Sequence, residues 1–199
     1  GYLQSQRWTV DVTIQSATNQ FVSGRTSVPI HKGEFYIGLS PRSYVATVGE
    51  ASDVDVVTIT PQGEPYPGVE LTAQVYEFAW NSVYEKTADG SFAWKTSVER
   101  TPILTTTLTT DREGSALLTW TPEKGGQYQI VASGEDDAGN AISSATYLWV
   151  SGGEFIAWPR QNNDRIELVA DKKSYAPGDT AEILIPSPFT GTVEALITL

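Results

Sequence analysis

Apolar and polar residues alternate with a period of two along most of the chain, and this alternation limits the possible folds more than any other feature. In WTVDVTI (8–14), for example, Trp8, Val10 and Val12 are apolar and the residues between them are polar. Successive side chains of a β-strand point to opposite faces of the sheet, so this pattern predicts a strand with one buried face. The same period recurs in SALLTW (115–120), QYQIVAS (127–133), RIELVA (165–170) and TVEALITL (192–199). No stretch of helical length shows the apolar spacing of an amphipathic helix, so we expect an all-β protein.

Short clusters of turn-forming residues separate these predicted strands. They are PQGEPYPG (61–68), TADG (87–90), TDREG (110–114), PEKGG (122–126) and EDDAGN (135–140). Glycine, proline, aspartate and asparagine favour tight turns, and short strands at this spacing are typical of a β-sandwich or barrel. Because no helix is available to cross between parallel strands, the sheets should be antiparallel. We therefore predict tandem antiparallel β-sandwich domains.

Two stretches rich in glycine and aromatic residues are candidate joints between domains. GEFYIGLSPRSY (33–44) and SGGEFIAWPRQNND (151–164) each combine a glycine hinge with rings that could wedge against a neighbouring module. We therefore divide the chain into the closing strands of a preceding domain (1–36), a complete sandwich (37–152) and the opening strands of a following domain (153–199). Each partial domain would expose unpaired strand edges, so we expect another part of the polypeptide or a second copy of the chain to complete it.

A weak internal repeat supports this division. PRSYVATVGEASDVDVV (41–57) and KKSYAPGDTAEILIP (172–186) each contain a Ser-Tyr pair, then a glycine followed by an acidic residue, then an alternating strand. In the second copy, Pro177 and Gly178 predict a type II turn, because proline presets the first corner and glycine accepts the positive φ of the second. Asp179 could cap the amides of this turn, and Tyr175 should lie over the core edge with its hydroxyl near water.

The longest aromatic cluster lies in VELTAQVYEFAWNSVYEKTADGSFAWK (69–95). The apolar residues first occupy odd positions up to Val75, and the aromatic residues then occupy even positions: Tyr76, Phe78, Trp80, Tyr84, Phe92 and Trp94. This change predicts a β-bulge near residues 75–76 or an extended hairpin whose second face is also covered. The rings could form an exposed platform for a sugar or a protein. We favour a hairpin that packs against an adjacent module, because aromatic anchors are common at such interfaces.

Charge and composition exclude several classes of function. The formal net charge is -11, with 24 acidic and 13 basic residues, and nucleic acids and anionic membranes require basic patches instead. The chain has no cysteine, which removes disulfides, thiolate metal sites and cysteine nucleophiles. No apolar run approaches the ~20 residues that span a bilayer. Since the chain begins without Met or a signal peptide, we expect a piece of a longer protein.

No residue pattern identifies a catalytic, cofactor-binding or metal-binding site. His31 is the only histidine; it should be a solvated strand residue, and no G-x-S-x-G motif supplies a serine partner. Glu135, Asp136, Asp137 and Asn140 offer oxygen ligands of the kind that Ca²⁺ takes. Their spacing does not match a calcium loop, and a tight hairpin turn would explain the same residues. We therefore predict no catalytic residue, no cofactor and no metal.

The last 28 residues, KKSYAPGDTAEILIPSPFTGTVEALITL, resemble the start of a macroglobulin-type domain in bacterial α2-macroglobulins, the large protease-trapping proteins. That family has a Y-x-P-G-[DE]-x-A motif, then an apolar strand, Pro, Phe, Gly and a second strand. The matching positions are Tyr175, Pro177, Gly178, Asp179 and Ala181, followed by Pro188, Phe189, Gly191 and Ala195–Leu199. Residues 146–155 and 158–172 are similar to the family's domain junction, and residues 109–133 resemble its preceding domain.

The resemblance implies an extracytoplasmic, non-catalytic piece of a broad-spectrum endopeptidase inhibitor. Members of the family string together fibronectin-like sandwiches, carry a protease-sensitive bait segment, and often hold a Cys-Gln thioester in another domain. This sequence contains neither a C-x-E-Q motif nor a bait-like stretch, so the resemblance implies scaffold domains that meet proteases only through the parent protein. The alternative function is an Ig-like cell-surface adhesion or carbohydrate-binding module that uses the hairpin around Trp80 and Trp94.

Overall fold

A computed structural model describes residues 5–152, 156, 158, 165–187, 189 and 193–196. These residues form strands and turns, and none of them lies in a helix. The strands are β1 (Gln6–Gln15), β2 (Phe21–Ile30), β3 (Tyr36–Pro41), β4 (Val45–Thr47), β5 (Ser52–Ile59), β6 (Glu70–Lys86), β7 (Phe92–Thr109), β8 (Ser115–Trp120), β9 (Gly126–Glu135), β10 (Ala141–Ser151), β11 (Val169–Ala170) and β12 (Ile183–Leu184). Within this described part of the chain, no helix could span a membrane.

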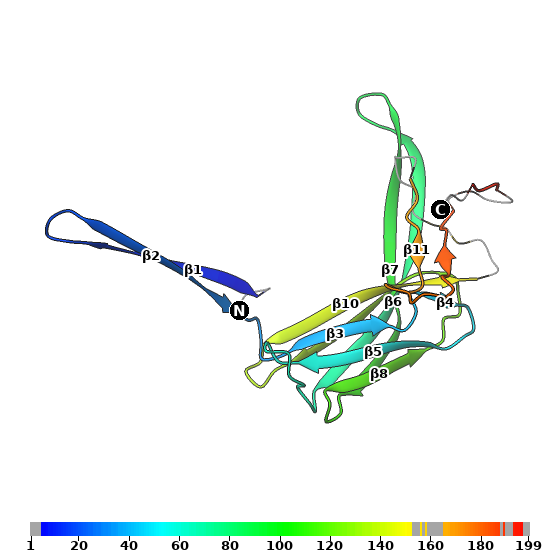
Figure 1. Cartoon of the computed structure of the whole chain (residues 1–199). Coiled ribbons are helices and arrows are strands. Elements are labelled where there is room, and N and C mark those ends of the chain that lie inside the picture. Colours follow the sequence, from blue (N-terminus) through cyan, green and yellow to red (C-terminus); the bar gives the residue numbers. More distant parts are fainter. Residues whose placement is uncertain are drawn as a thin grey trace.

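The body of the molecule is a β-sandwich, as the alternation predicts (Figure 1). One sheet has the order β4-β10-β9-β6-β7, and the other has the order β3-β5-β8. The pairings are antiparallel except that β4 runs parallel to β10. The expectation of antiparallel pairing is therefore wrong for this one short pair. The chain passes from β3 in one sheet directly to β4 in the opposite sheet, so the parallel pairing of β4 with β10 requires no crossover helix.

The core lies between the two sheets and follows the period of two. Along β5, Val54 and Val56 are fully buried while the residues between them are partly exposed. Leu71 of β6, Tyr128 of β9 and Leu148 of β10 fill the opposite side of the same core. Burial of such alternating apolar side chains is the main stabilising contribution to the sandwich.

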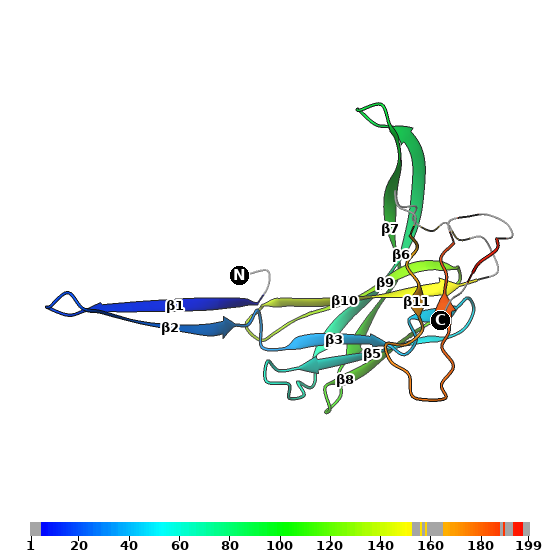
Figure 2. The ribbon, with the colours of Figure 1, turned by 45° about the horizontal axis from the view of Figure 1, so that its top comes forward.

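The hairpin of β1 and β2 differs from the body, because both of its faces are exposed (Figures 1 and 2). Trp8 pairs with Val28 and Ile14 pairs with Val22, so their side chains share one face. Trp8 remains 49% exposed and Ile14 67% exposed. The strand prediction for residues 8–14 is confirmed, but its expected burial is not found, because no second sheet of the described chain covers this face.

The strands β6 and β7 continue beyond the sandwich as a long hairpin, which we call the arm (residues 76–102; Figure 2). Val75 pairs with Leu104 but Tyr76 pairs with Pro102, so Ile103 is the extra residue of a β-bulge. The predicted bulge at residues 75–76 is confirmed, with the extra residue on the partner strand. Because β6 keeps its own alternation, the aromatic residues from Tyr76 onward lie on the outer face of the five-stranded sheet.

Candidate functional site

Two buried carboxylates mark the places where other segments join the sandwich. Asp136 is 7% exposed and Asp171 is 8% exposed, and no other charged side chain among the described residues is buried. A carboxylate is buried at low cost only when hydrogen bonds replace its water. The N-terminal joint comprises residues 31–36 and the 136–140 turn. The C-terminal joint comprises residues 43–48, 149–152 and 169–182.

Asp136 closes the turn between β9 and β10 and also holds the incoming linker. Its Oδ1 accepts hydrogen bonds from the backbone N–H groups of Ala138, at 3.1 Å, and Asn140, at 2.8 Å. Its Oδ2 accepts from the Asn140 side-chain amide, at 2.9 Å, and from the Glu34 backbone N–H, at 3.0 Å. These bonds lower the pKa of Asp136 below its usual value, and the bond from the Asn140 side chain contributes most to that shift.

The linker also packs closely against the sandwich through Gly33 and Phe35. A Cβ atom added to Gly33 would lie 2.7 Å from Ile142 and 2.9 Å from Asp136. Phe35 is buried and stacks on Tyr66, with ring centroids 5.1 Å apart. The expected glycine hinge is therefore a packing contact: Gly33 lets the linker approach the body, and Phe35 belongs to the core of the sandwich.

Polar side chains tie the base of the first hairpin to the start of β3. The Tyr36 hydroxyl lies 2.6 Å from His31 Nδ1 and 2.7 Å from Ser5 Oγ, and the Lys32 backbone N–H donates to Ser5 Oγ. His31 is exposed, as predicted, but it takes part in this network. The Tyr66 hydroxyl donates to Glu34, and burial followed by this bond raises the pKa of Tyr66.

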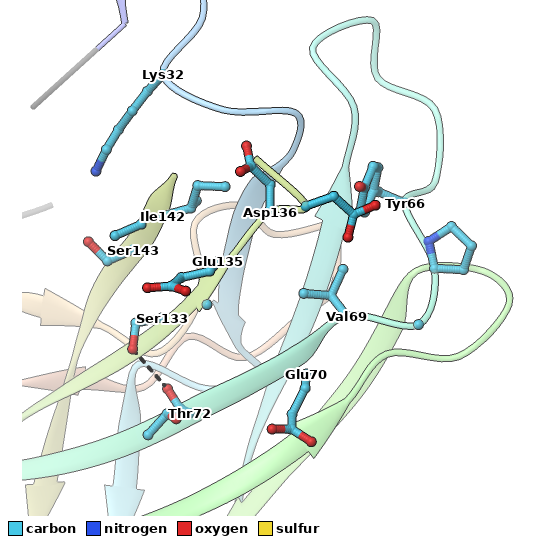
Figure 3. Close-up of a pocket in the computed structure, with 15 residues that line it drawn as sticks. Lys32, Tyr66, Val69, Glu70, Thr72, Ser133, Glu135, Asp136, Ile142 and Ser143 are labelled. Carbon is cyan, nitrogen blue, oxygen red and sulfur yellow. Dashed lines mark hydrogen bonds between the residues drawn. The ribbon is translucent and has the colours of Figure 1, made fainter. Parts of the chain in front are cut away.

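An open groove of about 820 Å³ lies beside the N-terminal joint (Figure 3). Glu70, Glu135 and Asp136 line it together with Lys32. In the part of the chain that the structure describes, no group of three or more histidine, cysteine or acidic residues is placed to hold a metal ion. Asp136 uses both of its oxygens for the turn and the linker, so the hairpin-turn alternative accounts for this acidic sequence.

At the C-terminal joint, Asp171 organises the outgoing segment. Its Oδ1 accepts hydrogen bonds from the Tyr175 hydroxyl, at 2.6 Å, and from the Glu182 backbone N–H, at 3.0 Å. The bond from Tyr175 is the main cause of the lowered pKa of Asp171, and it raises the pKa of Tyr175 in return. The hydroxyl of Tyr175 was expected near water; it instead meets the carboxylate four residues before it.

The outgoing segment contacts the sandwich through backbone hydrogen bonds and through close packing at two glycines. The Tyr44 N–H donates to the Asp171 carbonyl at 2.8 Å, and the Tyr44 carbonyl accepts from the Trp149 N–H at 2.9 Å. A Cβ on Gly125 would collide with the Ile156 side chain, and one on Gly152 would lie 2.7 Å from Val48. Close approach at these two glycines therefore sets the path of the chain as it leaves β10.

The two copies of the internal repeat form matching turns. In the first, the Glu50 N–H donates to the Thr47 carbonyl, and Gly49 has φ +82. In the second, the Asp179 N–H donates to the Ala176 carbonyl and Gly178 has φ +95, as predicted for a type II turn. The Asp179 carboxylate also accepts the Ala176 N–H at 2.9 Å, which confirms its capping role. The segment 188–199 of the resemblance lies largely outside the described residues. Within it, residues 193–196 are described and do not form the predicted strand.

The aromatic face of the arm offers little exposed tryptophan. Trp80 and Trp94 are half-buried, whereas Tyr84 is 55% and Phe92 is 58% exposed. Tyr84 contacts both Phe92 and Trp94, with ring centroids 5.6 and 5.1 Å apart. The surface that the arm presents is therefore made by Tyr84 and Phe92, not by the two tryptophans named for a carbohydrate platform.

Sequence reasoning missed the pairing of Asp171 with Tyr175 and of Tyr44 with Asp171. The two stretches that it named as candidate joints, residues 33–44 and 151–164, each contain a glycine in close contact with the sandwich, Gly33 and Gly152. The available signal for Asp171 was an acidic residue four positions before Tyr175 of the Ser-Tyr pair. Nothing in the local sequence indicates Tyr44, because its bond crosses 127 positions of the chain.

Comparisons with known proteins place these features in a family context. The profile of the family described as "Bacterial macroglobulin domain 6" matches residues 38–151. An alpha-2-macroglobulin homolog from Nostoc sp. is 27% identical over 90% of this chain and 9% of its own length. Alpha-2-macroglobulin from Pasteurella multocida is 25% identical over 93% of this chain and 10% of its own length. The chain thus spans about a tenth of the length of these curated relatives.

Solved structures share the fold at lower sequence identity. E. coli alpha-2-macroglobulin in its native conformation matches with a TM-score of 0.58 and 16% identity, over 91% of this chain and 12% of that one. Salmonella alpha-2-macroglobulin reacted with methylamine matches with a TM-score of 0.55 and 16% identity, over 92% and 12%. Both structural matches cover more than nine tenths of this chain, so they include parts of the regions on either side of the sandwich.

Proposed function

The chain belongs to the bacterial macroglobulin domain 6 family, and on that premise we propose that it is a non-catalytic scaffold within a bacterial alpha-2-macroglobulin that traps endopeptidases. Its task is to hold neighbouring modules at a fixed geometry. The observation that carries this proposal is the pair of buried carboxylates, Asp136 and Asp171, one at each joint. A flexible linker would need neither the buried charge nor its full set of hydrogen bonds.

The proposed division of the chain has three parts. Residues 37–152 are the complete sandwich, residues 1–36 contribute closing strands to a preceding domain, and residues 153–199 open a following one. The exposed apolar face of the β1–β2 hairpin supports the first boundary, since an isolated two-stranded hairpin is marginally stable in water. A second sheet from the preceding domain would cover that face and make it half of a core.

The proposed partners and location follow from the relatives. The partners are adjacent domains of the same polypeptide, and proteases meet the chain only through its parent protein. The parent would act outside the cytoplasm, in the periplasm, at the cell surface or after secretion. The alpha-2-macroglobulin names of the Nostoc and Pasteurella relatives support this assignment.

A pair of substitutions to valine in the intact parent protein tests the scaffold role. A Cβ on Gly33 would lie 2.7 Å from Ile142 and 2.9 Å from Asp136, so Gly33→Val displaces the linker, whereas Gln62→Val changes an exposed residue of a turn outside both joints. We expect the Gly33 variant to trap less of an added endopeptidase, measured as protease activity left on a large protein substrate. The Gln62 variant should trap as much as the unchanged protein. Equal trapping by a folded Gly33 variant would contradict the proposal.

A further inference from the structure

A pocket of about 360 Å³ lies at the foot of the arm. It opens where the edge strands of the two sheets, β7 and β8, lie next to each other. Ile103 and Leu104 line it from β7, Trp120 from β8 and Tyr128 from β9. The bulge contributes directly to its wall, because Ile103 has no partner in β6 and is 43% exposed.

The floor of the pocket is aromatic and apolar. Trp120 is 6% exposed and Tyr128 is 1% exposed, and their ring centroids are 4.9 Å apart. Together with Ile103, these rings form a surface that suits the aliphatic part of a long side chain.

One hydrogen-bond donor in this wall has no acceptor. The indole N–H of Trp120 is buried, and no described residue accepts its proton. Buried donors are nearly always paired in folded proteins, so an unpaired one calls for an explanation. Because Trp120 lines the pocket, a carbonyl group of a bound molecule is a candidate for the missing acceptor.

Two carboxylates, Glu77 and Glu123, and one cation, Lys124, line the pocket, which leaves it with a net negative charge. Glu77 lies directly opposite Tyr128 in the sheet, and Glu123 lies in the following loop. Burial and then the charges of Glu77 and Glu123 raise the pKa of Tyr128 to about 12, which places both carboxylates near the phenol. The Tyr128 hydroxyl donates its proton to the Lys124 carbonyl at 2.8 Å, so it does not donate a hydrogen bond to either carboxylate. Among the described residues, neither carboxylate forms an ion pair or hydrogen bond.

We propose that this pocket binds a lysine or arginine side chain carried by an extended polypeptide segment. The aliphatic stem lies against Ile103 and Trp120, the cation lies between Glu77 and Glu123, and a backbone carbonyl of the segment accepts the Trp120 N–H. This ligand matches the apolar floor, the negative rim and the unpaired donor together. The proposal does not depend on the scaffold role of the two joints.

A matched pair of small probes tests the proposal. Nα-acetyl-lysine methylamide carries the cation and the carbonyl groups, and Nα-acetyl-norleucine methylamide keeps the stem without the charge. NMR would follow the indole N–H signal of Trp120, assigned with Trp120→Phe. We expect a saturable shift with the lysine probe in the millimolar range, and binding of the norleucine probe that is roughly tenfold weaker or more.

Substitutions in the protein separate charge from packing. Glu77→Gln and Glu123→Gln should each weaken the lysine probe roughly tenfold, while Glu64→Gln, in an exposed turn, should leave it unchanged. Lys124→Ala should strengthen binding, because it removes a competing cation from the rim. The proposal fails if the lysine probe gives no saturable shift, if both probes bind equally, or if folded Gln variants bind as the unchanged protein does. If a variant does not fold, the comparison of the two probes on the unchanged protein decides.

Discussion

The two joints use the same chemical group in opposite ways. At the N-terminal joint the carboxylate belongs to the sandwich, and Asp136 reaches out to the backbone of Glu34 in the linker. At the C-terminal joint the carboxylate belongs to the attached segment, and Asp171 satisfies itself within that segment through Tyr175 and Glu182. Its link to the sandwich is the backbone bond from Tyr44. Loss of the side chain should therefore detach a segment at one joint but disorganise a segment at the other.

The largest expected effect comes from destabilising the core of the sandwich, which tests whether both joints depend on the same folded core. Leu71 is fully buried in the core, and Leu71→Ala should lower the free energy of unfolding by about 2–5 kcal/mol through lost burial and the cavity left behind. Urea denaturation followed by tryptophan fluorescence measures this loss. Backbone amides at both joints should lose protection together. Separate loss at the two joints would show that the sandwich does not couple them.

Removal of the first carboxylate should act on the linker and its turn. Asp136→Ala leaves the N–H groups of Glu34 and Asn140 without their acceptor, so we expect amide hydrogen exchange at Glu34 to rise roughly tenfold or more. Exchange at Glu182 should stay unchanged. Asp137→Ala, at the adjacent exposed position, is the matched control. A similar rise at Glu182 would break the distinction between the joints.

Removal of the second carboxylate should have a more local effect. In Asp171→Ala, the Glu182 amide should exchange faster and the Tyr175 hydroxyl should become solvated, because both lose their acceptor. Urea denaturation of the sandwich should be almost unchanged. Asp171→Asn, which keeps one acceptor oxygen, should give an intermediate result. If the sandwich itself loses stability, Asp171 contributes to the body as well as to its own segment.

Acid should weaken both joints. We expect this effect to be the smallest of the four, because it is absent at neutral pH, where both aspartates are ionised. The pKa of each aspartate is lower in the folded chain than the ~3.9 of a free side chain. The hydrogen bonds to the ionised form therefore contribute fully above that value and are lost as pH falls through the lower, folded pKa. NMR signals of the Glu34 and Glu182 amides should shift below about pH 4. Each shift should disappear in the Asn variant of its own joint, and persistence there would assign it to another group.

Local patterns in the sequence predicted the features that depend on neighbouring residues. The alternation located the strands of the sandwich, the change of parity after Val75 located the bulge, and Pro177 with Gly178 located a turn. Each of these follows from backbone geometry within a few residues. The acidic turn at residues 135–140 was recognised for the same reason.

Features that depend on distant contacts could not be predicted. The pattern in β1 required a buried face, but burial depends on what lies over a strand, and Trp8 is 49% exposed. The parallel pairing of β4 depends on Trp149, far along the chain. Asp171 resembles any surface aspartate until Tyr175 folds back on it. For the same reason, the sequence around Gly33 suggested a hinge. Its contact with Ile142 of β10, more than 100 positions later in the chain, could not be predicted from that sequence.

Strand β10 connects the two joints along a straight line through the sheet. It starts beside the turn that holds Glu34 and ends at Trp149–Ser151, where Tyr44 and the outgoing segment meet it. A pulling force applied between the two joints would thus act along the axis of β10. Its ladder with β9, from Ala141–Glu135 to Val150–Gly126, would be loaded in shear, so its hydrogen bonds would resist together and not open one after another. In the proposed scaffold role, this layout would let the sandwich transmit a movement from one neighbouring module to the next without unfolding.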